Sequence, residues 1–170
     1  MKRLLILSAI GIAMLMVVLP SWASISLNSS RSNVYRMVYP TDLVSQAQAT
    51  AMLAELDKLG PANETKLKQW LPANFKRFGI QESRVKQISI YLEQQVSCSA
   101  SVETCKGKWV GPDLNARNRA NALCFCYGPI TTPTQVQKVD KASPILILLL
   151  TDPKQEADAF AINLNSSKSN

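Results

Sequence analysis

Residues 144–151 read Pro-Ile-Leu-Ile-Leu-Leu-Leu-Thr and place six consecutive branched aliphatic side chains between a proline and a threonine. A run of this length without a polar position is typical of a strand whose two faces are both buried. It is far too short to span a bilayer, which takes about 20 residues. We therefore expect it to form the central strand of a sheet.

Three further stretches have the pattern of strands. Within residues 86–96, Ile88, Ile90 and Leu92 stand on one side and Ser89, Tyr91 and Glu93 on the other, which predicts a half-buried strand. Residues 123–127 are rich in aromatic residues and cysteine and are expected to be extended. Residues 160–164 alternate after a turn at residues 152–155, so we expect a last strand that pairs with the central strand as a hairpin.

Two helices are expected before these strands. Residues 42–59 repeat apolar side chains at intervals of three and four residues, and a glycine-proline pair at residues 60–61 ends the helix. A second helix follows Asn63, which is a favourable N-cap, and continues to Gly79 with a kink or break at Pro72. The two helices predict an αα-hairpin that buries its aromatic face in the core of the same domain.

These elements predict an α+β fold, in which an N-terminal αα-hairpin packs on a mostly antiparallel sheet of about four strands that is stapled by disulfide bonds. Four segments are expected along the chain. They are a signal peptide at residues 1–23, a flexible polar segment at residues 24–40, a single α+β domain at residues 41–165 and a disordered tail at residues 166–170.

The first 23 residues have the order of an export signal. Lys2 and Arg3 precede an apolar run that extends to residue 20, and Ser21 and Ala23 supply the small residues of a cleavage site. We expect cleavage near Ala23 and a periplasmic or secreted mature protein. The apolar run approaches the length of a membrane span, so an uncleaved anchor is the alternative.

The composition excludes several classes of active site. The chain contains no histidine, which excludes serine-histidine-aspartate and cysteine-histidine catalysis, histidine-containing zinc sites and histidine pH switches. Its carboxylates form no convincing catalytic pair by spacing, and its six glycines form no phosphate-binding loop. We therefore expect a protein without a cofactor or a metal that acts by binding rather than by catalysis.

The four cysteines of an exported chain indicate two disulfide bonds. Cys124 and Cys126 point to the same face of a strand with awkward geometry for a bridge, so each is expected to pair with Cys98 or Cys105, in either combination. Either arrangement staples the loop that follows the first predicted strand to residues 123–127. The alternative hypothesis is a thiol-disulfide redox protein that uses Cys124 and Cys126. The spacing disfavours a four-thiolate metal site.

Positive charge is concentrated in two parts of the chain, whose formal net charge is +7. One group of cations comprises Lys66, Lys68, Lys76, Arg77, Arg84 and Lys86. The second group lies in the loop at residues 98–119, after the first predicted strand. It supplies the predicted partner-binding residues, which are Lys106, Lys108, Trp109, Arg117 and Arg119. We expect these surfaces to meet a protein of the cell envelope or of a secretion assembly. A polyanion or an anionic membrane surface is the alternative partner, and nucleic acid is not an expected one.

Two heptapeptides of nearly identical sequence occur near the two ends of the mature chain. Residues 27–33 read Leu-Asn-Ser-Ser-Arg-Ser-Asn, and residues 164–170 read Leu-Asn-Ser-Ser-Lys-Ser-Asn. One interpretation is coincidence between two ends that are rich in serine and asparagine. The other is that both ends carry one recognition tag.

Overall fold

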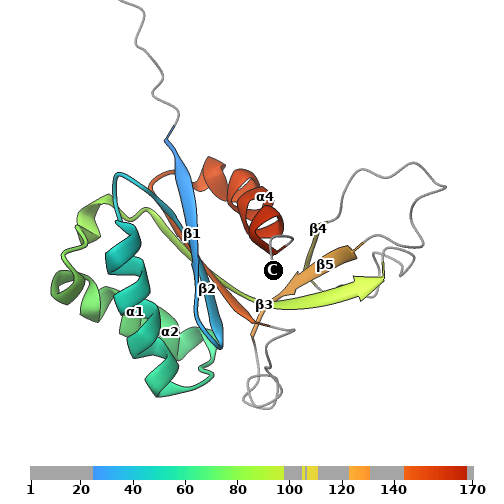
Figure 1. Cartoon of the computed structure of the whole chain (residues 1–170), viewed down its shortest axis with the longest axis horizontal. Helices are drawn as coiled ribbons and strands as arrows, with labels where there is room; N and C mark the ends of the chain where they lie inside the picture. Colours follow the sequence, from blue (N-terminus) through green and yellow to red (C-terminus); the bar gives the residue numbers. More distant parts are fainter. Residues whose placement is uncertain (1–24, 98–104, 106, 111–122, 131–143, 168–170) are drawn as a thin grey trace, which may run out of the picture.

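The computed structural model of the chain describes residues 25–97, 105, 107–110, 123–130 and 144–167. The strands of this part form one mixed sheet in the order β1-β2-β6-β3-β5-β4 (Figure 1). They are β1 (Leu27–Arg31), β2 (Tyr35–Pro40), β3 (Gln87–Ser97), β4 (Lys108–Val110), β5 (Leu123–Gly128) and β6 (Ile145–Leu150). The helices are α1 (Gln46–Leu59), α2 (Glu64–Phe75) and α4 (Glu156–Ser167), with short 3-10 turns η1 (Lys76–Phe78), η2 (Glu82–Arg84) and η5 (Pro153–Gln155).

Strand β6 is a central strand of the sheet, as the apolar run predicts. It pairs in parallel with β2 and antiparallel with β3, and all of its residues are buried. Its odd-numbered residues belong to the core on one face of the sheet, and its even-numbered residues belong to the core on the other. The run has no polar position because helices cover both faces.

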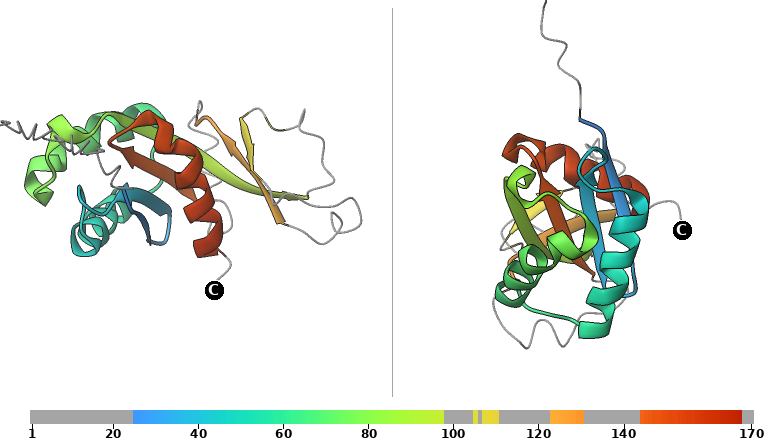
Figure 2. Two further views of the ribbon diagram at one scale, coloured as in Figure 1. Left: turned by 90° about the horizontal axis from the view of Figure 1, so that it is seen from above. Right: turned by 90° about the vertical axis from the view of Figure 1, so that its left-hand side faces the viewer.

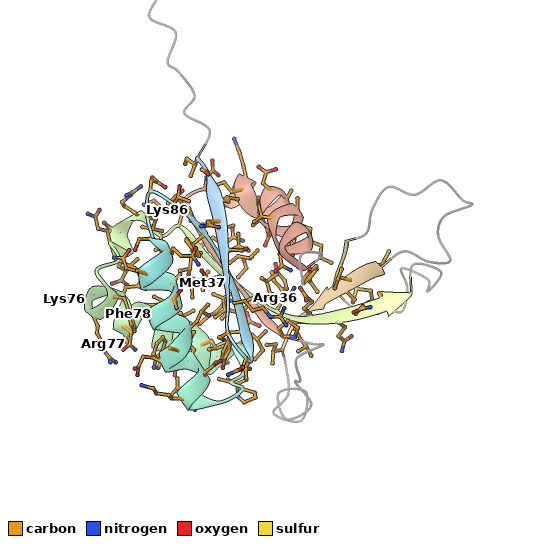
Figure 3. All side chains as sticks on the ribbon, viewed as in Figure 1. Arg36, Met37, Lys76, Arg77, Phe78 and Lys86 are labelled. Atoms are coloured by element: carbon orange, nitrogen blue, oxygen red, sulfur yellow. A yellow bond between two sulfur atoms is a disulfide. The ribbon has the colours of Figure 1, made fainter. Side chains whose placement is uncertain are left out.

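Helices α1 and α2 pack on the face of the sheet that carries Tyr35 and Met37, whereas α4 packs on the face that carries Val38 and Tyr127 (Figures 1 and 2). The alternation of a strand explains how neighbouring residues reach different layers. Figure 3 shows this on β2, where Met37 points to the side of α1 and Arg36 points to the opposite face.

Local sequence signals set the ends of α1 and α2. Ser45 caps α1 and forms a reciprocal capping box with Gln48. Gly60 follows the last residue of α1 with φ of 67° and ψ of −175°, a conformation that is essentially restricted to glycine. Asn63 caps α2 as predicted, and α2 continues through Pro72 as one helix rather than as two short ones.

Most of residues 24–40, predicted to be a flexible segment, forms the antiparallel pair β1–β2, and every residue of β2 is buried. Asp57 of α1 holds the connection between the two strands. Its carboxylate accepts hydrogen bonds from Ser32 Oγ at 2.7 Å and from the backbone N of Asn33 at 3.0 Å. The polar side chains of this stretch therefore have partners within the fold, and their polarity does not signal disorder.

Helix α4 occupies the place of the last strand predicted at residues 160–164. Asp152 and Gln155 form a capping box around η5, so the chain turns into a helical conformation soon after β6. Phe160 and Asn163, three residues apart on one face of α4, are both buried against the sheet. The alternation of apolar residues over so short a window also fits a helix, which explains the error.

The two similar heptapeptides do not share a conformation where the structure describes both. Residues 27–30 form most of β1, whereas residues 164–167, with the same four-residue sequence, form the last turn of α4. Tertiary packing decides between the two states because this polar sequence has no strong preference of its own.

The α+β class is confirmed, but the sheet is larger than predicted, and it is mixed because β2 and β6 are parallel. Strand β3 pairs with β6 over residues 87–92 and with β5 over residues 92–97. Residues 92–97 together with β5 and β4 form an arm that extends beyond α1 and α2 (Figure 2). Within the described ranges, no helix combines the length and the apolar character needed to cross a membrane.

Candidate functional site

The arm carries the part of the predicted partner-binding loop that the structure describes. Lys108 and Trp109 lie in β4. Outside the described residues lie Lys106, Arg117 and Arg119. The ammonium group of Lys108 is 3.9 Å from Oε2 of Glu156 and 4.3 Å from the ring centroid of Phe160, both on α4. Lys108 therefore ties the arm to the body of the protein, by an ion pair and a cation-π contact.

A disulfide bond joins Cys105, just before β4, to Cys126 in the middle of β5, with 5.6 Å between the two Cα atoms. Cys124 is also disulfide-bonded, and Cys98 lies outside the described residues. Both cysteines of β5 are buried. Because Cys126 bonds to Cys105, it does not form the strained Cys124–Cys126 bridge on which the redox hypothesis depends.

Gly107 lets the chain approach the backbone of β5 closely at the start of β4. A Cβ atom on Gly107 would lie 2.0 Å from the carbonyl oxygen of Tyr127 and 2.7 Å from Cα of Gly128. No side chain fits at that distance, so glycine is required for this connection between the disulfide and β4.

A buried polar network lies beneath α4, where β2, β3 and β5 contribute one residue each. Arg36 Nη1 is 3.0 Å from Glu93 Oε1, and Asn163 Nδ2 donates to Glu93 Oε2 at 2.5 Å and to the Tyr127 hydroxyl at 2.8 Å. All four residues are more than nine-tenths buried. Burial, together with the nearby charge of Glu93, raises the pKa of Tyr127 well above its usual value. The network is closed to solvent, so it connects α4 to the sheet and presents no exposed polar group for binding.

Sequence reasoning missed this network because its members come from segments whose structure it placed wrongly. Arg36 lies in the range predicted to be flexible, and Asn163 lies in the range predicted to be a strand. Glu93 stands on the polar side of the predicted strand at residues 86–96, where a solvated carboxylate is the usual expectation.

A second polar cluster lies near the start of α4. The hydroxyl of Tyr91 donates to Oε1 of Glu156 at 2.7 Å, and Gln87 Nε2 donates to the same oxygen at 3.2 Å. Burial and this hydrogen bond raise the pKa of Tyr91 to about 12, so the phenol remains protonated and is a poor base. In the part of the chain that the structure describes, no group of three or more cysteine or acidic side chains is placed to hold a metal ion.

Three of the six cations in the group at residues 66–86 form ion pairs with acidic residues. The pairs are Lys68 with Glu64, Arg77 with Glu55 and Arg84 with Asp42. Lys58 and Arg77 both lower the pKa of the Glu55 carboxyl, the hydrogen bond from Lys58 having the largest effect. This surface is therefore less basic than the sequence predicts.

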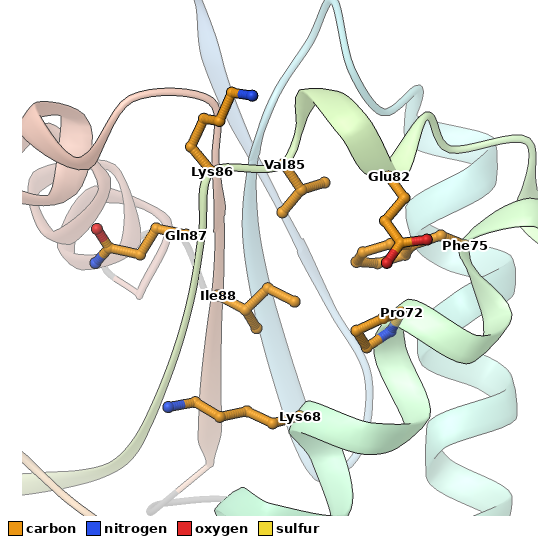
Figure 4. A pocket seen from close by; sticks show the side chains of 8 residues that line it. All are labelled: Lys68, Pro72, Phe75, Glu82, Val85, Lys86, Gln87 and Ile88. Atoms are coloured by element: carbon orange, nitrogen blue, oxygen red, sulfur yellow. The ribbon is translucent and has the colours of Figure 1, made fainter.

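A groove with a volume of about 330 Å³ opens between α2 and the start of β3 (Figure 4). Eight side chains line it, from Lys68, Pro72, Phe75, Glu82, Val85, Lys86, Gln87 and Ile88. The three residues of α2 follow at intervals of four and three and share one helix face. Two cations of the group at residues 66–86 thus stand beside an apolar surface, which the sequence did not show.

Comparison of the chain with protein-family models, with curated proteins and with solved structures finds no match. The function must therefore be inferred from the residues and the geometry described above.

Proposed function

We propose that this chain is an exported binding module, stabilised by disulfide bonds, that contacts a protein of the cell envelope or of a secretion assembly through its arm. The observation that carries the proposal is that β4 is connected to the rest of the fold by a disulfide bond and by the contacts of Lys108. The Cys105–Cys126 disulfide joins its entry to β5, and Lys108 contacts Glu156 and Phe160 of α4. The disulfide constrains the entry to this strand, from which the chain continues to residues 111–122, which include Arg117 and Arg119.

Binding is favoured over catalysis by the state of the reactive groups. The described cysteines are disulfide-bonded, and the pKa values of Tyr35 and Tyr91 are raised to about 12, in both cases chiefly by burial. These groups are neither free nucleophiles nor effective bases near neutral pH. Export is supported by the signal-like order of residues 1–23 and by the disulfide, which persists in an oxidising compartment.

The proposal is tested by photo-crosslinking in the source cells with the full chain, including its N-terminal residues. A photoreactive amino acid is placed at Arg117 or at Arg119, and a matched control carries it at Lys58, whose side chain is 70% exposed on α1. We expect a covalent adduct with one envelope protein from the two arm positions and none from Lys58. Equal adducts from all three positions, or none from the arm, would contradict the proposal.

Charge reversal then separates a protein partner from an anionic surface. The test variant combines Lys106→Glu, Arg117→Glu and Arg119→Glu, and it leaves Lys108 unchanged because that residue contacts α4. The control variant combines Lys58→Glu with Lys66→Glu and Lys76→Glu, which are away from the arm. We expect only the test variant to lose the adduct. Binding to anionic vesicles that disappears as salt rises, without a protein adduct, would favour the surface-binding alternative.

A further inference from the structure

The first half of β3 has an edge that faces away from β6. The backbone N of Glu93 donates to the carbonyl of Pro144 at 2.9 Å, which sets the alternation of the antiparallel pair. The N–H and C=O groups of Gln87, Ser89 and Tyr91 therefore face β6, and those of Ile88 face the opposite edge. Among the described strands, only β5 pairs with that edge, from Leu92 onward.

The groove beside α2 runs along this edge. Ile88 is partly exposed in it, Val85 and Pro72 supply apolar surface next to Ile88, and Phe75 lies buried behind them (Figure 4). An extended chain laid beside Ile88 would accept one hydrogen bond from its backbone N–H, donate one to its C=O and bury apolar side chains against α2. The shape of the groove thus suits an extended segment better than a helix.

Charge in the groove selects the kind of segment. Lys86 and Lys68 stand at opposite ends of the row of apolar side chains, and Glu82 is the one acidic residue among those that line the groove (Figure 4). Lys68 pairs with Glu64 on its own helix with half of its side chain exposed, and a surface pair of this kind is weak enough to be exchanged for another carboxylate. The net charge of the lining residues is positive, so it favours an acidic ligand.

We propose that this groove is a second binding site, and that it holds an extended segment of another protein with apolar residues beside Ile88 and an acidic residue next to Lys68 or Lys86. The segment adds to the edge of β3 as a short strand. The groove and the arm lie at opposite ends of β3, about 30 Å apart at the usual rise of a strand. Strand β3 therefore runs between the two sites, and, if the arm binds as proposed above, the chain joins two partners.

The test uses a library of random heptapeptides displayed on phage, selected on the full mature chain with its disulfides intact. We expect the enriched peptides to alternate apolar residues and to carry aspartate or glutamate. For the best peptide, the double variant Lys68→Glu/Lys86→Glu is expected to bind roughly tenfold more weakly than the wild type. The control variant Lys58→Glu/Lys66→Glu has the same charge change outside the groove and is expected to bind normally.

Hydrogen exchange reports the backbone contact directly. Binding of the selected peptide is expected to slow exchange of the Ile88 amide, which faces the groove, and to leave the amide of Ser89, which faces β6, unchanged. The proposal is overturned if no peptide is enriched, if the enriched peptides are neutral or basic, or if the Lys68→Glu/Lys86→Glu variant binds like the control. The arm variant Lys106→Glu/Arg117→Glu/Arg119→Glu is a further control. If this variant loses the peptide while Lys68→Glu/Lys86→Glu still binds it, the peptide binds to the arm and not to the groove.

Discussion

Arg36 and Glu93 form an ion pair of 3.0 Å across β6, the strand that separates β2 from β3 in the sheet. The pair lies near the point where β6 begins, since the backbone N of Glu93 donates to the carbonyl of Pro144. Asn163 of α4 holds the second oxygen of the carboxylate. One side chain, Glu93, thus connects three separate segments of the chain below α4.

Removal of one member of this pair is expected to be costly. Arg36→Met leaves the Glu93 carboxylate buried without its cation, and Glu93→Gln leaves the Arg36 guanidinium buried without its anion. Each single variant should lose about 3–5 kcal/mol of unfolding free energy, measured by urea denaturation of the oxidised protein. The double variant Arg36→Met/Glu93→Gln should lose clearly less than the sum of the two single losses. Additive losses would show that the two side chains are not coupled.

The Cys105–Cys126 disulfide at the base of the arm should stabilise the protein by restricting the unfolded chain. The double variant Cys105→Ser/Cys126→Ser removes a bond between residues 21 positions apart, and it should lose about 3 kcal/mol because the unfolded chain is freed. Denaturation of the variant beside the oxidised wild type measures the loss. An unchanged midpoint would mean that the bond does not constrain the unfolded chain.

Gly107→Ala should destabilise the arm selectively. The added methyl group would lie 2.0 Å from a carbonyl oxygen of β5, so β4 must move, at a cost of about 1–3 kcal/mol. Gly128→Ala is a matched control, because a Cβ atom there meets nothing within 4 Å. Faster hydrogen exchange in β4 and β5 of the Gly107 variant alone would support this packing. Equal exchange in both variants would speak against it.

We expect the unfolding free energy to fall at alkaline pH because Tyr35 and Tyr91 have raised pKa values. Burial raises the pKa values of Tyr35 and Tyr91 from 10 to about 12, so the folded protein holds these protons more tightly than the unfolded chain does. The unfolding free energy should therefore be unaffected below about pH 10 and should fall as the pH rises toward 12. Ultraviolet titration should show tyrosinate forming together with unfolding. Full ionisation near pH 10 in a folded protein would refute the assignment.

The sequence predicts the central elements well because their signals are local. Six apolar residues in β6, the alternation that starts at Ile88, and Asn63 at the start of α2 are each read within a few positions. The apolar run also indicates, through its lack of any polar position, that both faces of β6 are covered.

The remaining elements depend on contacts between distant residues. Polar residues 27–31 form a strand because Ser30 meets Tyr39 and because α1 supplies Asp57 to the next turn. The functional surfaces are harder still to see. Lys68 and Lys86 belong to one predicted group of cations, but only the packing of α2 beside β3 places them around an apolar groove. Lys108 was predicted to contact a partner, and its pairing with Glu156 is visible only once α4 is placed.

The position of β6 also determines how late the two parts of the sheet can join. Among the strands that the structure describes, it comes last in the sequence, yet it sits between β2 and β3 and alone joins the hairpin β1–β2 to the others. A polypeptide that emerges from its N-terminus first, from a ribosome or from a translocation channel, can form two separate half-sheets but cannot unite them until residue 150 has appeared. The two parts of the sheet therefore join late in synthesis or export, once residues 145–150 have become available to pair with both.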